Sequence, residues 1–237
     1  MKAEAGAAIA RYRWPVAKLT PDDLEAFVRD HPRGRPGFAE ALAAIARQMP
    51  AMRGAVLEWF RGALADEERK WHAAWILRSQ HVDARPLLRE LLRAALREPN
   101  PSFNRTFVEP LRRPALFAEA VEVMLSEAEL GGALERGGVG RVAYWLQLLP
   151  DSDEASWQRL RAWMLEEFVR ASDVLVLRSL VTGVRVEPDA YPEGAGPLLE
   201  VAIAKARAHP DEWVRHCIAR QLGESQGPFM ALRTDKE

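Results

Sequence analysis

The sequence has a single cysteine, Cys217, among its 237 residues. One thiol cannot form an internal disulfide, and it leaves no CxxC motif or Cys/His cluster of the kind that holds zinc. Long apolar runs are also missing: none approaches the ~18 residues needed to span a bilayer, and the apolar stretch at 5–10 is too short for the core of a signal peptide. These absences predict a cytoplasmic protein that is stabilised by packing and has no membrane partner.

An excess of charge of either sign is lacking as well. The 33 Lys and Arg side chains are balanced by 34 Asp and Glu side chains, which gives a net charge of −1. Because a strongly basic surface is what generally draws a protein onto nucleic acid, this balance disfavours nucleic acid as a partner. Apolar residues make up 48% of the chain and charged residues 28%, proportions that are typical of a folded globular protein.

Strand-like alternation is nearly absent, and helical periodicity takes its place. In residues 83–97, DARPLLRELLRAALR, five leucines recur at spacings of one, three and four residues and form the apolar stripe of an amphipathic helix. Similar patterns predict helices at 21–30, 37–48, 51–64, 66–80, 115–128, 138–149, 153–170, 172–184, 195–208 and 210–222. Clusters of glycine and proline, among them Gly137 and Gly138, predict the connections. Short helices joined by short loops imply antiparallel helix pairs.

A three-point pattern recurs along the chain: a basic residue, a small residue four positions later and a leucine seven positions later. It is clearest at Arg215, Ala219 and Leu222, and it recurs at Arg35 with Ala39 and Leu42. Basic residues occupy the corresponding positions 35, 70, 105, 141, 178 and 215, which are separated by 35, 35, 36, 37 and 37 residues. A period near 36 residues that holds two helices is the size of an α-solenoid repeat.

The segment 210–223 resembles the signature helix of HEAT repeats, in which an acidic residue, a Val-Arg pair, a small residue and a Leu-Gly ending recur. The matching residues are Asp211, Val214, Arg215, Ala219, Leu222 and Gly223. Elsewhere the match is partial, since the third unit has Pro110 within its helix and the fifth has Thr182 and Arg185 in place of alanine and leucine. Resemblance to this armadillo-type family implies a right-handed superhelical stack that binds proteins. A subset of HEAT-like proteins are DNA glycosylases for alkylated purines.

The predicted fold class is therefore all-α, a right-handed α-solenoid of about six HEAT-like antiparallel helix pairs. Residues 1–34 are predicted to form an N-terminal cap helix and lead-in, residues 35–223 a HEAT-like repeat domain, and residues 224–237 a polar C-terminal tail. The predicted function is that of a non-catalytic scaffold that presents a curved helical surface to a protein or peptide. A nucleic-acid-binding or DNA-repair protein of the alkylpurine glycosylase type is the alternative.

A candidate binding surface follows from the register of the basic residues, because positions one, two and five residues later face away from the core. Several of these positions hold large apolar side chains, and an exposed apolar strip usually marks a contact surface. The candidate anchors are Trp71, Trp75, Val142, Leu146 and Leu180. Two interpretations stay open: a partner-binding groove, or a register that slips by one residue in the middle units, so that these side chains belong to the core.

A second candidate surface is basic and lies on the predicted helix at 83–97. Its four arginines follow one another at four-residue steps: Arg85, Arg89, Arg93 and Arg97. Such a stripe could bind phosphates or an acidic peptide. The nearby Glu90 and Glu98 favour an ordinary solvated face instead. If the stripe contributes to binding, the protein or peptide partner is expected to be acidic.

The arginines that define the register also have a structural explanation. On an ideal helix Arg215 lies beside the core direction, so it is expected to be partly buried. A buried guanidinium needs hydrogen-bond partners, most simply loop carbonyls or an acid such as Asp211 or Asp173. The acidic runs at 66–68 and 151–154 precede predicted helices, where carboxylates cap free amide groups.

Catalytic arrangements are sparse, and the sequence predicts no enzyme, no cofactor and no metal site. His216 and Cys217 are adjacent, so on a helix their side chains diverge by about 100° and cannot act together as base and nucleophile. The glycosylases of the HEAT-like fold set a Trp and an Asp one helical turn apart, and the nearest pair here is Trp163 and Glu167. The glycine-rich segment 131–140 lacks the Lys-Ser/Thr of a phosphate-binding loop.

Overall fold

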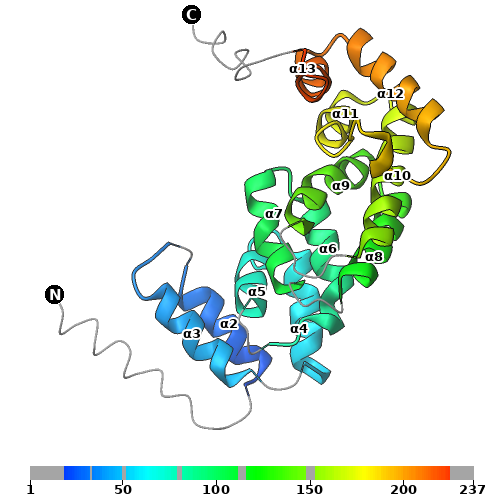
Figure 1. Ribbon diagram of the computed structural model, residues 1–237. Coiled ribbons are helices and arrows are strands. Elements are labelled where there is room, and N and C mark those ends of the chain that lie inside the picture. The colour runs from blue at the N-terminus through cyan, green and yellow to red at the C-terminus, as the bar shows by residue number, and fades with distance from the viewer. Residues whose placement is uncertain are drawn as a thin grey trace, which may run out of the picture. The chain divides into compact units, whose positions relative to one another are not determined.

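The computed structural model describes residues 19–32, 34–49, 52–78, 82–111, 116–147 and 153–224. Every regular element in these ranges is an α-helix or a short 3-10 helix, which confirms the predicted all-α class (Figure 1). Residues 1–18 of the predicted cap and 225–237 of the predicted tail lie outside the described residues. The chain forms two compact units: unit 1 is Met1–Ala94 with Thr106–Arg112, and unit 2 is Ala95–Arg105 with Arg113–Glu237.

Unit 1 begins with two helix pairs. α2 (Pro21–Asp30) and α3 (Phe38–Gln48) are followed by α4 (Gly54–Ala65) and α5 (Lys70–Leu77). α2 packs against α4 and α3 against α5, so each helix of the first pair contacts its counterpart in the second. The 3-10 helix η1 (Arg85–Leu87) packs on α4 and leads into α6 (Leu88–Arg97). α7 (Pro101–Val108) then continues as the 3-10 helix η2 (Glu109–Leu111).

Unit 2 also consists of helix pairs, in which a first helix is followed along the chain by a second. Its elements are α8 (Phe117–Leu130), α9 (Ala133–Leu146), α10 (Glu154–Arg170), α11 (Val174–Leu180), η4 (Pro188–Ala190), α12 (Gly196–Ala208) and α13 (Glu212–Gln221). α8 packs on α10 and α10 on α12, while α9 packs on α11 and α11 on α13. Figure 1 shows the corresponding arrangement, with α8, α10 and α12 following one another on one side of this unit. Each pair therefore covers an apolar face of the next.

Acidic residues cap helix starts, as the sequence predicts. At the start of α10 the Asp153 carboxylate accepts hydrogen bonds from the backbone N–H groups of Ala155 and Ser156. Before α5 the Asp66 carboxylate accepts one from the backbone N–H of Arg69, and this bond lowers the pKa of Asp66. The carboxylates thus satisfy amide groups that have no partner within the helix.

Gly137 and Gly138 lie inside α9, so the predicted connection at these residues is wrong. A Cβ atom at Gly138 would lie 2.3 Å from the carbonyl oxygen of Leu96, and one at Gly140 would lie 2.2 Å from the carbonyl oxygen of Ser179. These glycines therefore permit α9 to approach two neighbouring backbones closely, which is a reason for glycine inside a helix. α9 begins at Ala133, before the predicted residue 138.

The third helix pair also differs from the prediction. The ranges predicted from apolar periodicity contain no counterpart of α7, which has eight residues. Pro110, expected inside a helix, lies in η2 after α7 has ended at Val108. Proline has no N–H group and its ring clashes with the preceding turn, so an α-helix ends before it.

Candidate functional site

Three of the predicted surface anchors are core residues. Val142, Leu146 and Leu180 each have a relative exposure of 0%, so they do not lie on a surface that a partner could reach. The interpretation of these side chains as a binding strip is therefore wrong, and they belong to the core. The physical reason is that α9 packs on both α8 and α11 and also approaches the chain at Leu96, and a helix enclosed in this way buries residues around most of its circumference.

The two tryptophans of the predicted strip are half-buried and have different neighbours. The Trp71 ring lies 5.0 Å from the ring of Phe107, and the Lys70 ammonium lies 5.4 Å from the centre of the same indole. The Trp75 ring lies 5.1 Å from that of Phe38 on α3. Trp71 therefore packs against the last turn of α7, whereas Trp75 borders a groove against α3.

This groove, the α3–α5 groove, lies in unit 1 and has a volume of about 400 Å³. It is lined by Ala39, Leu42, Ala43, Ala46 and Arg47 of α3, by Trp75 of α5 and by Arg78 directly after α5. The first four residues are spaced i, i+3, i+4 and i+7, so they lie along one side of α3. Small and apolar side chains thus form one wall, and a half-buried indole forms the other.

The Trp75 indole is held in position by neighbouring rings. The planes of Phe38 and Trp75 are inclined by 68°, and the His72 ring centre lies 6.2 Å from that of Trp75. Edge-to-face arrangements of this kind are favourable. His72 is buried, and its Nε2–H donates a hydrogen bond to the carbonyl oxygen of His31 at 3.1 Å. The aromatic wall of the groove is therefore preformed.

The charge along the groove has one sign. Arg47 and Arg78 are the charged side chains in its lining, which includes no carboxylate among the described residues. Arg78 forms an ion pair with Glu109 and keeps 49% of its side chain exposed. Arg47 is exposed and forms no ion pair with any residue that the structure describes. The α3–α5 groove thus combines apolar surface with positive charge, which complements a segment of opposite charge.

The α3 side of this groove was not predicted from the sequence. Ala39 and Leu42 belong to the three-point pattern, and the structure shows Ala39 exposed and Leu42 half-buried. Arg47 and Arg78 were not recognised as site residues. A usable signal is present in the segment FAEALAAIARQ, whose apolar residues cover more of the helix surface than packing on one side requires.

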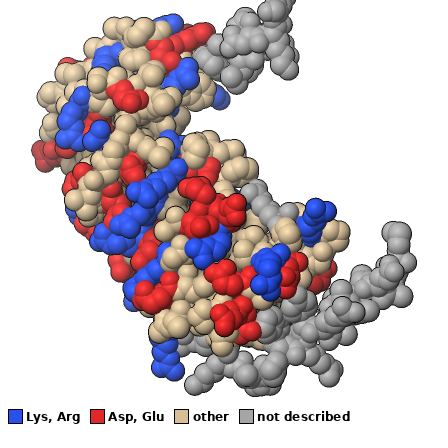
Figure 2. Space-filling view, turned by 180° about the vertical axis from the view of Figure 1, so that it is seen from behind, with Lys and Arg blue, Asp and Glu red and all other residues tan. Residues whose placement is uncertain are grey.

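The arginines of the second candidate surface are exposed. They are Arg85 in η1, Arg89 and Arg93 on α6, and Arg97 at the end of α6. Carboxylates accompany this segment: in unit 1 Glu90 pairs with Arg61 at 3.3 Å, and in unit 2 the Arg97 guanidinium lies 2.9 Å from the Glu135 carboxylate. On the face drawn in Figure 2, basic and acidic side chains alternate in small groups. Phosphate or acidic-peptide binding by these arginines stays a prediction.

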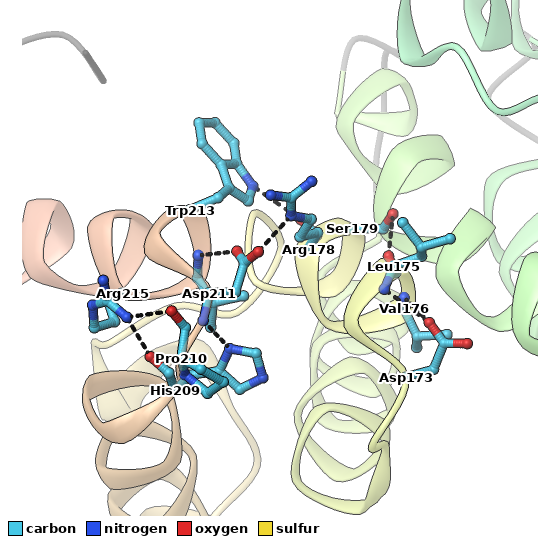
Figure 3. A network of polar contacts seen from close by, with 11 residues as sticks. Asp173, Leu175, Val176, Arg178, Ser179, His209, Pro210, Asp211, Trp213 and Arg215 are labelled. Atoms are coloured by element: carbon cyan, nitrogen blue, oxygen red, sulfur yellow. Dashed lines mark hydrogen bonds and ion pairs between the residues drawn. The ribbon is translucent and has the colours of Figure 1, made fainter. Parts of the chain in front are cut away.

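Two of the register-defining arginines connect neighbouring helices of unit 2. The guanidinium of Arg215 is half-buried and donates hydrogen bonds to the carbonyl oxygens of His209 and Pro210, each at 2.6 Å (Figure 3). The Arg178 guanidinium donates to the Asp211 carboxylate at 2.9 Å. The prediction that loop carbonyls bind the Arg215 guanidinium is confirmed. Asp211, the other partner considered for Arg215, accepts a hydrogen bond from Arg178 instead.

The remaining register positions have other surroundings. Arg141 donates to the carbonyl oxygens of Leu96 and Glu98 at 3.0 and 3.2 Å. The Arg105 guanidinium lies 5.7 Å from the centre of the Trp145 ring. Lys70 pairs with Glu67, and Arg35 is exposed before α3 begins. Each of the six cations therefore lies within or next to the second helix of a pair, but their surroundings differ.

The residues considered for catalysis have structural partners. Glu167, the carboxylate closest in spacing to the glycosylase acid, is buried and forms ion pairs with Arg136, at 3.1 Å, and with Arg170. Its half-buried neighbour Trp163 lies one turn earlier on α10. Burial raises the pKa of the Cys217 thiol to about 11, so the thiol is protonated near neutral pH and is a poor nucleophile.

Two further features are absent from the part of the chain that the structure describes. It contains no group of three or more His, Cys, Asp or Glu side chains positioned to hold a metal ion. None of its helices combines the length and the apolarity needed to cross a bilayer.

Comparison of the chain with models of protein families, with curated proteins and with solved structures found no match. The α3–α5 groove is therefore interpreted from its own geometry.

Proposed function

We propose that this protein is a non-catalytic binding module that captures a protein or peptide segment in the α3–α5 groove. The observation that carries the proposal is the lining of the groove: apolar side chains of α3 face a positioned indole, beside two arginines and no carboxylate among the described residues. Apolar surface bordered by charged groups is the usual composition of a protein contact.

We also infer that the helix pairs follow one another as a HEAT-like, right-handed solenoid of the armadillo type. The inference is supported by contacts between counterpart helices of successive pairs, α3 with α5 in unit 1 and α9 with α11 in unit 2. The period of the basic residues supports it as well. In such a fold each pair completes the core of its neighbour, so the exposed helix faces are available for partners.

Trp75 and the two arginines are the residue types that dominate binding energy in protein interfaces. Loss of such an anchor typically costs at least about 2 kcal/mol, which corresponds to roughly a 30-fold weaker affinity. Trp75 is already positioned by Phe38 and His72, so its conformational entropy is largely lost before the partner binds. A preformed anchor of this kind favours binding.

The proposal is tested by placing a photo-crosslinking amino acid at Ala43 of the full chain and irradiating it in an extract of the source cells. Ala43 is exposed and lines the groove, whereas Ala204, exposed on α12, provides a matched control position. We expect discrete protein adducts at position 43 that excess unlabelled wild-type protein suppresses. No adduct at position 43, or the same adducts at position 204, would overturn the proposal.

A further inference from the structure

We infer that the segment bound in the α3–α5 groove is an amphipathic α-helix that carries acidic side chains. This inference rests on the proposed function and specifies the partner of the same site. It follows from the shape of the groove, from the hydrogen bonding of the backbone groups around it and from the charge of its lining.

The α3 wall fits the surface of another helix. Ala39, Ala43 and Ala46 lie on one side of α3 with Leu42, and the seven steps from Ala39 to Ala46 cover about 10 Å of helix. Interaxial distances between packed helices range over about 8–10 Å according to the side chains at the contact. Alanine at three of these positions favours the shorter distances, so a partner helix can lie along α3 with its own large side chains reaching toward Trp75.

The backbone around the groove gives a second reason for a helix. The lining residues belong to α3, to α5 and to the cap position after α5, whose backbone groups are largely paired within their own helices. An extended peptide bound by strand addition needs an open sheet edge, which a helical wall does not provide. A bound helix pairs its own N–H and C=O groups and needs from the groove only side-chain contacts.

The charge of the lining selects an acidic helix. Arg78 follows Trp75 by three residues, and Arg47 follows Ala46 directly, so both guanidinium groups lie within about one turn of the apolar wall. A helix with large apolar residues at i and i+4 would contact Leu42 and Trp75, and a carboxylate one turn further along would reach an arginine. Charged hydrogen bonds between carboxylate and guanidinium are stronger than neutral ones, and a lysine at the same place would be repelled.

Arg78 can accept such a carboxylate although it already pairs with Glu109. Its side chain is 49% exposed, and a guanidinium group has five N–H donors. Arg47 is the more accessible of the two, since it has no ion-pair partner among the described residues. Arg47 is therefore the better position for a charge-reversal variant, because its replacement leaves no buried carboxylate unpaired.

The test uses the full chain and three fluorescently labelled peptides of about 18 residues, or five helical turns. The first carries leucines at helical spacing with glutamates on the flanks, the second has lysines in place of the glutamates, and the third has the composition of the first in a scrambled order. We expect fluorescence anisotropy to show at least about tenfold tighter binding of the first peptide than of either other peptide, with an affinity that falls as salt is added.

Three variants separate the groove from the rest of the surface. Arg47→Glu and Ala43→Glu are each expected to weaken binding of the acidic helix at least about tenfold, and Arg47→Glu is expected to improve binding of the lysine peptide. Ala204→Glu introduces the same side chain at an exposed position on α12 and is expected to leave both affinities unchanged. Since all three positions are exposed, the variants should fold, which circular dichroism can verify.

Several outcomes would overturn the inference: equal binding of the scrambled peptide, preference for the lysine peptide, or no effect of Arg47→Glu. A crosslinked adduct with twice the mass of the chain would show that a second copy occupies the groove, and this too contradicts it. If position 43 gives partner adducts while the acidic helix shows no preference, the inference fails and the proposed function stands. If neither assay gives a signal, the proposed function fails as well.

Discussion

Gly140→Ala is the substitution that most directly tests the packing of α9 against α11. A Cβ atom at this position would lie 2.2 Å from the carbonyl oxygen of Ser179, 2.7 Å from its carbonyl carbon and 3.0 Å from the Cα atom of Leu180. Because all three are backbone atoms, no side-chain rotation relieves the clash, and one helix must move. Gly140 itself lies in the middle of α9, where alanine would otherwise be favoured.

The expected magnitude is the difference between two effects. Overpacking of a well-packed core typically costs about 1–3 kcal/mol, and contact with rigid backbone places this site at the upper end of that range. Replacing glycine by alanine within a helix contributes about 1 kcal/mol in the opposite direction. The free energy of unfolding should therefore fall by about 2 kcal/mol, which corresponds to a decrease in melting temperature of roughly 4–8 °C for a chain of this length.

Gly62→Ala is the matched control because Gly62 also lies within a helix, α4, but a Cβ atom there would meet nothing within 4 Å. Its melting temperature should rise or stay unchanged. Both variants and the wild type are compared by thermal melting, which is monitored by the circular dichroism signal of the helices. If Gly140→Ala proved as stable as Gly62→Ala, the close approach of α9 and α11 would be refuted.

Two further predictions concern unit 2. The Lys205 ammonium donates hydrogen bonds to three carbonyl oxygens at the end of α10. Lys205→Met should therefore lower the free energy of unfolding by about 1–3 kcal/mol. An unchanged urea denaturation curve would contradict this capping role. Because burial raises the pKa of Cys217 from 9.0 to about 11, iodoacetamide at pH 8 should alkylate the native thiol about a hundredfold more slowly than the unfolded one. Stability should also fall as the pH rises from about 9 toward 11, since the unfolded chain loses the thiol proton first; equal alkylation rates in the two states would contradict both expectations.

Apolar periodicity was sufficient to predict most of the helices, because an amphipathic stripe reflects burial on one side of a helix. The predicted range 21–30 coincides with α2, and 195–208 differs from α12 by one residue at its start. Periodicity failed where burial is not one-sided. Gly137 and Gly138 have the local pattern of a connection, and only contacts with chain segments distant in sequence explain why they lie inside α9.

The candidate site was harder to predict than the helices. Trp75 was recognised as a candidate anchor, but the arginines assigned to the surface lay elsewhere, and the groove also depends on Arg47 and Arg78. These residues come from α3 and from the end of α5, and the sequence does not state which sides of two helices face each other. A shift of one residue turns a helix by 100°, which is enough to exchange a buried position such as Val142 for an exposed one.

Two of the periodic cations, Arg141 and Arg215, meet a chemical requirement that recurs at helix ends. Each α-helix ends with carbonyl groups that have no partner within the helix, and a helix pair buries some of them. In unit 2 the carbonyls that end α6 are bound by Arg141, those that end α10 by Lys205, and those that follow α12 by Arg215. A positive charge also complements the negative end of the helix dipole. Arg141 and Arg215 belong to the sequence register and Lys205 lies outside it, so this requirement of helix ends accounts for two of the six periodic cations. Arg178, Arg105 and Lys70 instead contact a carboxylate or an indole.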